Sequence, residues 1–266
     1  MEKYDVKFKK KFGQNFLKDS NIVKRIVGIS GVDKDSLVIE VGPGGAIMTK
    51  ELASIAKNVI AYEIDKDLAP ELESRLDGFD NVDIIFQDFL EADLVSDVST
   101  YSYKNLYFVS NVPYYITTPI ILKLIKSGLK FDNIVMMVQK EVGDRFSTAP
   151  GSREYGSITV LLNYFYEIKK EFFISRKQFI PEPNVDSVVV SFRERDDKYE
   201  VSNFDFFETI IRDSFQFKRK NIRNNLKKYD LKIVESVLKE YGYDLSVRAE
   251  NLSVEVFAKI SNALWK

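Results

Sequence analysis

Short apolar runs of strand length alternate with helical segments along the first half of the chain, and this alternation limits the possible folds more than any other feature. Each run is followed directly by a polar residue or a glycine, and the runs are 37–41, 59–62, 82–86, 106–109 and 134–138. Strands that alternate with helices form a parallel sheet with helices on both faces. We therefore predict an α/β fold whose ligands bind at the carboxyl ends of the strands.

The later part of the chain departs from this alternation. Residues 160–166 and 187–192 are predicted as two further strands, and the chain between them leaves no room for a helical crossover, so we expect an antiparallel element at one sheet edge. The composition turns charged around residues 193–198. We place a boundary there, between a domain of residues 1–195 with a basic N-terminal arm and a helical domain of residues 196–266. The helices expected in the second domain are 204–215, 221–228, 231–241 and 253–265.

Histidine and cysteine are both absent from the sequence. Their absence excludes a disulfide, a cysteine nucleophile, a Cys/His zinc site and a histidine general base. We also find no dense acidic loop of the calcium-binding kind, and we expect no metal. No apolar run is long enough to cross a membrane and the N-terminus has no apolar signal core, so we expect a cytoplasmic protein.

Glycine and acidic residues follow the first three predicted strands in order. Gly42 and Gly44 follow the first strand, Glu63 follows the second and Asp88 the third. Glycines let the backbone approach a ligand closely, and a carboxylate at the second strand end can accept hydrogen bonds from both ribose hydroxyls. A dinucleotide site would have a third glycine where this chain has Ile47. The series favours S-adenosylmethionine over a nicotinamide cofactor, and a dinucleotide-dependent oxidoreductase remains the alternative.

The fourth predicted strand is followed by Ser-Asn-Val-Pro-Tyr-Tyr at residues 110–115. Taken alone, this segment is equally consistent with a turn that ends a strand. It also suits methylation of an adenine amine, a weak nucleophile that needs two hydrogen-bond acceptors more than it needs a strong base. The side-chain oxygen of Asn111 and the carbonyl of Val112 can be those acceptors. Pro113 can fix the carbonyl, and Tyr114 can stack on the base.

Motifs along nearly the whole chain resemble those of the ribosomal RNA adenine dimethyltransferases. Residues 111–114 resemble the Asn-(Leu/Ile)-Pro-Tyr motif of that family, with Val112 as the one departure. Within the family, the Val-Asp-Ser and Arg-Ala-Glu-Asn-Leu-Ser sequences are similar to those of the bacterial small-subunit type. Further segments that look like the family are 13–17, 40–44, 63–65, Asp88, 139–142, 179–187 and 248–253.

This resemblance implies a Rossmann-like methyltransferase domain and dimethylation at N6 of two adjacent adenosines near the 3′ end of small-subunit ribosomal RNA. It implies a monomeric enzyme that acts on the small ribosomal subunit or its precursor, and it implies that Phe179 packs on the target base opposite Tyr114. The alternatives are a large-subunit RNA methylase and a non-enzymatic assembly factor. The cofactor contacts expected from the resemblance are Asn15, Leu17, Gly42, Gly44, Glu63, Ile64, Asp88, Phe89 and Asn111.

Basic residues gather in the helical domain, although the net charge of the whole chain is only −1. With so small a net charge, attraction to RNA has to come from local patches. Residues 212–232 are such a patch, with Phe215 and Phe217 interleaved among the cations. A run of this kind is often a solvated helix face, but beside a nucleobase enzyme it favours phosphate contact. The expected RNA contacts are Lys218, Arg219, Lys220, Arg223, Lys227 and Lys228.

Overall fold

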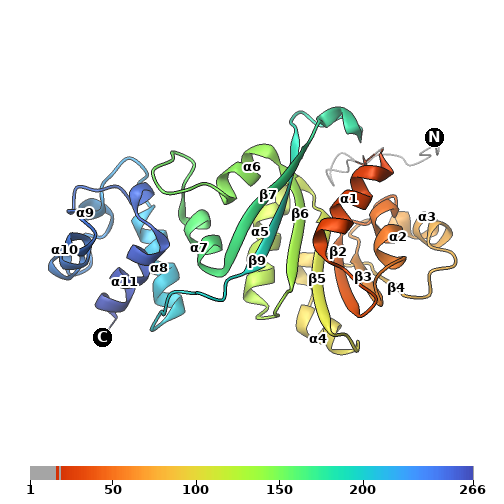
Figure 1. Ribbon diagram of the computed structural model, residues 1–266, viewed down its shortest axis with the longest axis horizontal. Helices are drawn as coiled ribbons and strands as arrows, with labels where there is room; N and C mark the ends of the chain where they lie inside the picture. Colours follow the sequence, from red (N-terminus) through yellow and green to blue (C-terminus); the bar gives the residue numbers. More distant parts are fainter. Residues whose placement is uncertain (1–15, 18, 266) are drawn as a thin grey trace. The chain divides into compact units, whose positions relative to one another are not determined.

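The computed structural model describes residues 16–17 and 19–265, which divide into two compact units (Figure 1). Unit 1 contains the chain up to Gly143 together with Lys169–Arg193, and unit 2 contains Asp144–Ile168 together with the chain from Glu194 onward. The later boundary lies close to the expected one. The segment 144–168, which the sequence assigned to the first domain, belongs instead to unit 2.

A seven-stranded sheet forms the framework of unit 1, in the order β4-β3-β2-β5-β6-β9-β7. The five strands from β4 to β6 are parallel, and β9 runs antiparallel to β6. The mostly parallel sheet with an antiparallel strand toward one edge confirms the predicted fold class. The strands are β2 (Ser36–Val41), β3 (Asn58–Tyr62), β4 (Val82–Ile85), β5 (Asn105–Asn111), β6 (Asn133–Gln139), β7 (Tyr166–Ile174) and β9 (Ser187–Glu194).

Helices connect the parallel strands and bury the faces of the sheet. Every residue of β2 is buried, as expected for a central strand that is covered on both faces. On one face, α1 and α2 pack against each other and on alternate strand residues such as Val38, Val59 and Val109. The helices are α1 (Ser20–Ser30), α2 (Ile47–Ala53), α3 (Ala69–Arg75), α4 (Leu94–Ser99), α5 (Thr117–Lys126) and α6 (Lys140–Phe146).

The predicted strand at residues 160–166 is wrong. Ser157–Phe165 form a helix, α7, and the strand β7 begins only at Tyr166. The helix starts after Gly156, whose backbone N–H donates to the hydroxyl of Thr159 at 3.3 Å. A short apolar run does not by itself distinguish a buried strand from a buried helix. The true edge strand was missed because its charged residues, typical of sheet edges, conceal the alternating pattern.

Unit 2 is helical and has its own apolar core. Phe207 of α8 and Phe257 of α11 are fully buried there, and Val160 of α7 belongs to the same cluster. The side chains of Asn203 and Ser253 accept hydrogen bonds from the first turns of α8 and α11. The remaining helices of unit 2 are α8 (Phe204–Ser214), α9 (Ile222–Asn225), α10 (Leu231–Glu240) and α11 (Val254–Leu264).

A helix that crosses a membrane has to be both long and apolar. Within residues 16–17 and 19–265, no helix has both the length and the apolar character that a membrane span requires.

Candidate active site

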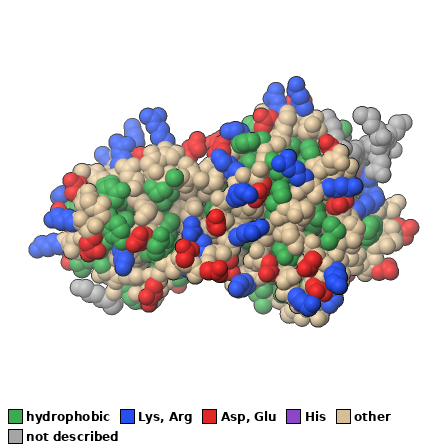
Figure 2. Space-filling view, in the orientation of Figure 1, with side chains coloured by type: hydrophobic (Ala, Val, Ile, Leu, Met, Phe, Trp, Pro, Cys, Tyr) green, Lys and Arg blue, Asp and Glu red, His purple; other side chains and the backbone are tan. Residues whose placement is uncertain are grey.

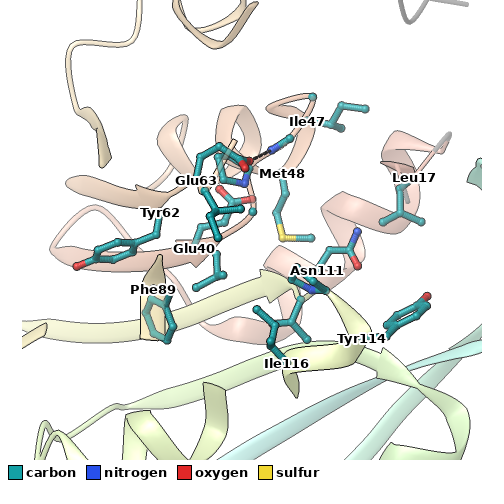
Figure 3. Close-up of a pocket in the computed structure, with 18 of the residues that line it drawn as sticks. Leu17, Glu40, Ile47, Met48, Tyr62, Glu63, Phe89, Asn111, Tyr114 and Ile116 are labelled. Atoms are coloured by element: carbon teal, nitrogen blue, oxygen red, sulfur yellow. Dashed lines mark hydrogen bonds between the residues drawn. The ribbon is translucent and has the colours of Figure 1, made fainter. Parts of the chain in front are cut away.

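The carboxyl ends of β2, β3, β4 and β5 open onto one cavity of about 1120 Å³, a volume that includes space open to solvent (Figure 3). The chain order of the sheet reverses between β2 and β5. Ligands of open α/β sheets bind at such a reversal, because the connections diverge there and leave a crevice. The predicted residues that line the cavity are Leu17, Gly42, Gly44, Glu63, Ile64, Asp88, Phe89, Asn111, Val112, Pro113 and Tyr114.

The glycine turn after β2 presents backbone to the cavity. Gly42 and Gly44 have φ angles of 73° and 51°, in the left-handed region that favours glycine. A Cβ atom on Gly42 would lie 3.8 Å from Pro113, which is an ordinary contact. Glycine is therefore favoured at this position by the backbone conformation and not by a lack of space for a side chain. The turn is anchored by a hydrogen bond of 2.9 Å from the Gly42 N–H to the carbonyl of Tyr62.

Glu63 holds a buried carboxylate at the wall of the cavity. One oxygen accepts from the backbone N–H of Asp65 at 2.9 Å. The other accepts from the backbone N–H of Gly44 at 3.4 Å, and Figure 3 shows the Glu63 side chain at the cavity. Burial raises the pKa of Glu63, and the two backbone hydrogen bonds oppose that rise. The carboxylate is therefore oriented by the backbone before any ligand arrives.

Glu40 is a second buried acid on the same wall, and the sequence reasoning gave it no role beyond its motif. Burial raises its pKa from the ordinary 4.5 to about 8, the Thr49 hydroxyl opposes the rise, and the charge of Glu63 adds to it. Its Oε2 atom has no hydrogen-bond partner among the described residues. A buried polar atom on a cavity wall is a group that a polar ligand can satisfy.

The segment after β4 is held by hydrogen bonds of two kinds, one to the Asp88 side chain and two from Lys123. Asp88 accepts a hydrogen bond of 2.9 Å from the N–H of Leu90 and so begins a short 3₁₀ helix, η3 (Phe89–Glu91). The ammonium group of Lys123 on α5 donates to the carbonyls of Leu90 and Ala92 at 2.9 and 2.6 Å. The Phe89 ring is buried and packs edge-on against Tyr62, with ring centroids 5.2 Å apart.

Asn111 is the last residue of β5, and the next residues turn sharply into the 3₁₀ helix η4 (Tyr114–Ile116). Pro113 has φ −57° and ψ 125°, which ends the strand. The hydroxyl groups of Tyr114 and Ser187 lie 2.6 Å apart, and Ser187 is fully buried at the start of β9. The sequence placed Ser187 in a motif, but only the fold shows that it holds the Tyr114 side chain.

Among the described residues, the predicted Phe179 does not line this cavity, and Asn15 lies outside the described residues. Phe179 is 1% exposed and belongs to the core cluster that contains Leu17. The reason is a two-stranded sheet in which β1 (Phe16–Leu17) pairs with β8 (Phe179–Ile180), so that Leu17 is opposite Phe179. In this arrangement Phe179 lies opposite Leu17, and its expected contact with the target base stays a prediction.

Tyr115 also lines the cavity, and its side chain is 58% exposed. The sequence predicts no role for Tyr115 beyond packing. Partial burial and then the charges of Asp88 and Glu63 raise the pKa of Tyr115. Its hydroxyl group therefore lies in the field of both acids at the mouth of the cavity.

The six predicted RNA-contacting cations are all exposed on unit 2. Figure 2 shows Lys and Arg side chains projecting from the surface of this unit. Lys228 differs from the other five, because its ammonium group forms an ion pair of 2.8 Å with the carboxylate of Asp213. We therefore assign Lys228 a part in the structure of unit 2 as well.

Comparison with known proteins agrees with this geometry. The family model described as ribosomal RNA adenine dimethylase matches residues 5–266. A Bacillus pumilus protein named ribosomal RNA small subunit methyltransferase A is 42% identical over 275 residues, covering 100% of this chain and 94% of its own length.

Two crystal structures extend the comparison. The 23S rRNA methyltransferase ErmE has a TM-score of 0.74 and 27% identity, covering 94% of this chain and 100% of its own. A dimethyladenosine transferase from Plasmodium falciparum has a TM-score of 0.77 and 25% identity, covering 92% and 95%. The family match over nearly the whole chain, together with these relatives, shows that this chain belongs to the ribosomal RNA adenine dimethylase family.

Proposed function

We propose that this chain transfers methyl groups from S-adenosylmethionine to N6 of two adjacent adenosines near the 3′ end of small-subunit ribosomal RNA. The observation that supports the proposal is that Glu63, Asp88 and Asn111 line one cavity, at the point where the strand order of the sheet reverses. The identity of 42% to a relative named for the small subunit, against 27% to the 23S rRNA methyltransferase ErmE, supports the small subunit as the substrate.

The residues of the cavity fit S-adenosylmethionine. The carboxylate of Glu63 is placed to accept hydrogen bonds from ribose hydroxyls, and Asp88 to accept one from an adenine amine. The glycine turn leaves room for the amino-acid part of the cofactor, and the buried Glu40 oxygen offers it an acceptor. When bound, this cofactor would supply a methyl group on a positively charged sulfur.

The chain's own contribution to the chemistry is to hold the target amine. The Asn111 side-chain oxygen and the Val112 carbonyl accept its two hydrogens, so that the nitrogen lone pair is freed from the ring. Tyr114, tied to Ser187 at 2.6 Å, provides a ring on which the base stacks. This is catalysis by orientation and hydrogen bonding, which requires no strong base and suits a chain without histidine.

The partner that we propose is the small ribosomal subunit, contacted through the exposed cations of unit 2. Phosphate contacts of this kind position a structured RNA without reading its sequence. The target base has to leave its stack to reach Asn111, as in other enzymes that act on a nucleobase.

The proposal is tested with methyl-labelled S-adenosylmethionine and purified ribosomal subunits from cells that lack this protein. We expect label in small-subunit RNA, at adenosine, and none in large-subunit RNA. Label confined to the large subunit would replace the proposed substrate with that of the large-subunit methylases. Absence of label in both, together with tight binding to the small subunit, would favour a non-enzymatic assembly factor.

A further inference from the structure

The turn between α8 and α9 places one aromatic ring in solvent. Phe217 is 54% exposed, although its neighbour Phe215 packs inward, with ring centroids 6.2 Å from Tyr155 and 5.7 Å from Phe257. Phe215 thus belongs to the core of unit 2 and Phe217 does not. A single exposed ring is ordinary on a protein surface, and Phe217 becomes a candidate for contact with a partner because of the fixed turn that carries it and the cations around it.

The backbone beneath this ring is fixed. The N–H of Lys220 donates to the carbonyl of Phe217 at 2.8 Å and closes a four-residue turn. The buried side chain of Asn225 accepts from the N–H of Phe217 at 3.1 Å and donates to the carbonyls of Phe217 and Lys220, both at 3.4 Å. A ring on a prearranged turn loses little backbone entropy when a partner binds it.

The charges around Phe217 indicate the chemistry of that partner. Lys218, Arg219 and Lys220 form the rest of the turn and are exposed, and none has an ion-pair partner within the described part of unit 2. Asp213, the acid on the preceding helix, is already engaged by Lys228 at 2.8 Å and by the hydroxyl of Tyr229 at 2.5 Å. Three adjacent cations that no acid neutralises complement a polyanion, and an apolar pocket on a protein would not require them.

We propose that Phe217 stacks on an unpaired nucleobase of the RNA substrate, while Lys218, Arg219 and Lys220 contact the phosphates around that nucleotide. Aromatic rings among cations are the common means of holding single-stranded nucleic acid, because every base offers a flat face for stacking. The proposal rests on the proposed function only for the identity of the RNA. It adds a site on unit 2 that holds a nucleotide other than the target adenosines.

The test measures equilibrium binding of the full-length protein to undermethylated small ribosomal subunits, at salt concentrations from about 50 to 200 mM. We expect Phe217→Ala and Phe217→Leu to weaken binding by about 5- to 100-fold at every salt concentration, and Phe217→Tyr to bind as the unmodified protein does. The slope of log affinity against log salt should stay unchanged in all three. Lys218→Gln should instead reduce that slope by about one.

Controls separate stacking from misfolding and from catalysis. Tyr199→Ala, at another exposed aromatic of unit 2, should bind as the unmodified protein does, and all variants should unfold at the same temperature. At saturating subunit concentration, Phe217→Ala should keep the methylation rate, because the residue does not line the active-site cavity.

Three outcomes would overturn the proposal. The first is full affinity in Phe217→Ala, and the second is full affinity in Phe217→Leu, which would indicate an apolar contact without stacking. The third is a photo-crosslink from a benzophenone side chain at position 217 to a ribosomal protein and not to RNA. If the unmodified protein methylates the small subunit but these outcomes occur, only the stacking site fails. If it binds the subunit through Phe217 without methylating it, only the proposed function fails.

Discussion

At the scale of single residues, the contact between Tyr114 and Ser187 links a cavity-lining ring to the core of the sheet. Ser187 is fully buried and begins β9, the strand antiparallel to β6. The 2.6 Å contact between the two hydroxyl groups fixes the direction of the ring before the base binds. We therefore propose that Ser187 is a positioning residue and that Tyr114 is the residue that touches the substrate.

We predict that Tyr114→Phe and Ser187→Ala each lower kcat/KM for methyl transfer by about five-fold, the effect of one lost hydrogen bond of about 1 kcal/mol. The double variant should be no worse than either single variant, because both remove the same contact. Tyr114→Ala removes the ring as well and should cost at least ten-fold more. Additive losses in the double variant, measured by steady-state kinetics, would show that the contact has no part in positioning the base.

Glu40 gives a pH prediction at the same scale. Its pKa is raised by burial from 4.5 to about 8 in the folded protein, so between these pH values the folded state keeps a proton that the unfolded state has lost. The free energy of unfolding should therefore fall as pH rises from about 5 to about 8. In Glu40→Gln this fall should be smaller, with a remainder from Glu63, whose pKa is also raised. Urea unfolding at each pH measures the free energy of unfolding of the unmodified protein and of Glu40→Gln, both without cofactor. Identical pH dependence in the two proteins would falsify the assignment of the raised pKa to Glu40.

At the scale of elements, the site is a set of strand ends made rigid by the segments that follow them. The 3₁₀ helix η3 after β4 is the clearest case, because Lys123 reaches from α5 to the carbonyl of Leu90 in this helix and to that of Ala92 directly after it. This ties the segment that carries Asp88 and Phe89 to a helix of the sheet.

Replacing Lys123 by Met keeps most of the side-chain volume and removes both hydrogen bonds. We expect the dissociation constant for S-adenosylmethionine to rise about five-fold, or about 1 kcal/mol, because η3 loses its fixed position. Calorimetric titration measures this constant. Lys126→Met, at an exposed lysine of the same helix, is the matched control and should bind the cofactor normally. Equal affinity in both variants would mean that the Asp88 cap alone holds the segment.

The elements also show what the sequence could predict. The central parallel strands were predictable because strands buried on both faces are nearly continuous apolar runs, as in 37–41 and 134–138. Their polar ends predicted the site, because parallel strands bring their carboxyl ends to the same edge. The run at residues 160–166 was misassigned, because its apolar residues face the core of unit 2, which is formed mainly by residues far along the chain.

Roles that depend on contacts between distant segments were not predictable. Ser187 contacts Tyr114 although 73 positions of sequence separate them, and no local sequence pattern predicts that contact. Phe179 is buried beside Leu17 because β8 pairs with β1, and no local pattern predicts that pairing. Its expected contact with the target base stays a prediction.

At the scale of the whole molecule, the two units are not consecutive halves of the chain. Residues 144–168 are inserted between parts of unit 1, yet Tyr155 and Val160 are buried in the same core as Phe207 and Phe257. The chain after residue 194 is therefore needed to cover α7.

We predict that a chain ending at residue 195 does not fold as an independent methyltransferase domain. Removing residues 196–266 would expose the apolar face of α7, and such a patch promotes aggregation. The expected results are low soluble yield and loss of a single cooperative transition on heating. A truncated protein that stays soluble and unfolds cooperatively at the temperature of the full chain would contradict the division into units.

Methylation of small-subunit ribosomal RNA at the cavity edge by Asn111 is tested by mass spectrometry of that RNA from cells that lack this protein and carry either the unmodified gene or Asn111→Ala. We expect N6,N6-dimethyladenosine at two adjacent positions near the 3′ end with the unmodified gene. We expect none with Asn111→Ala, although that variant accumulates as a folded protein. Full dimethylation with Asn111→Ala would show that methyl transfer does not need the Asn111 side chain.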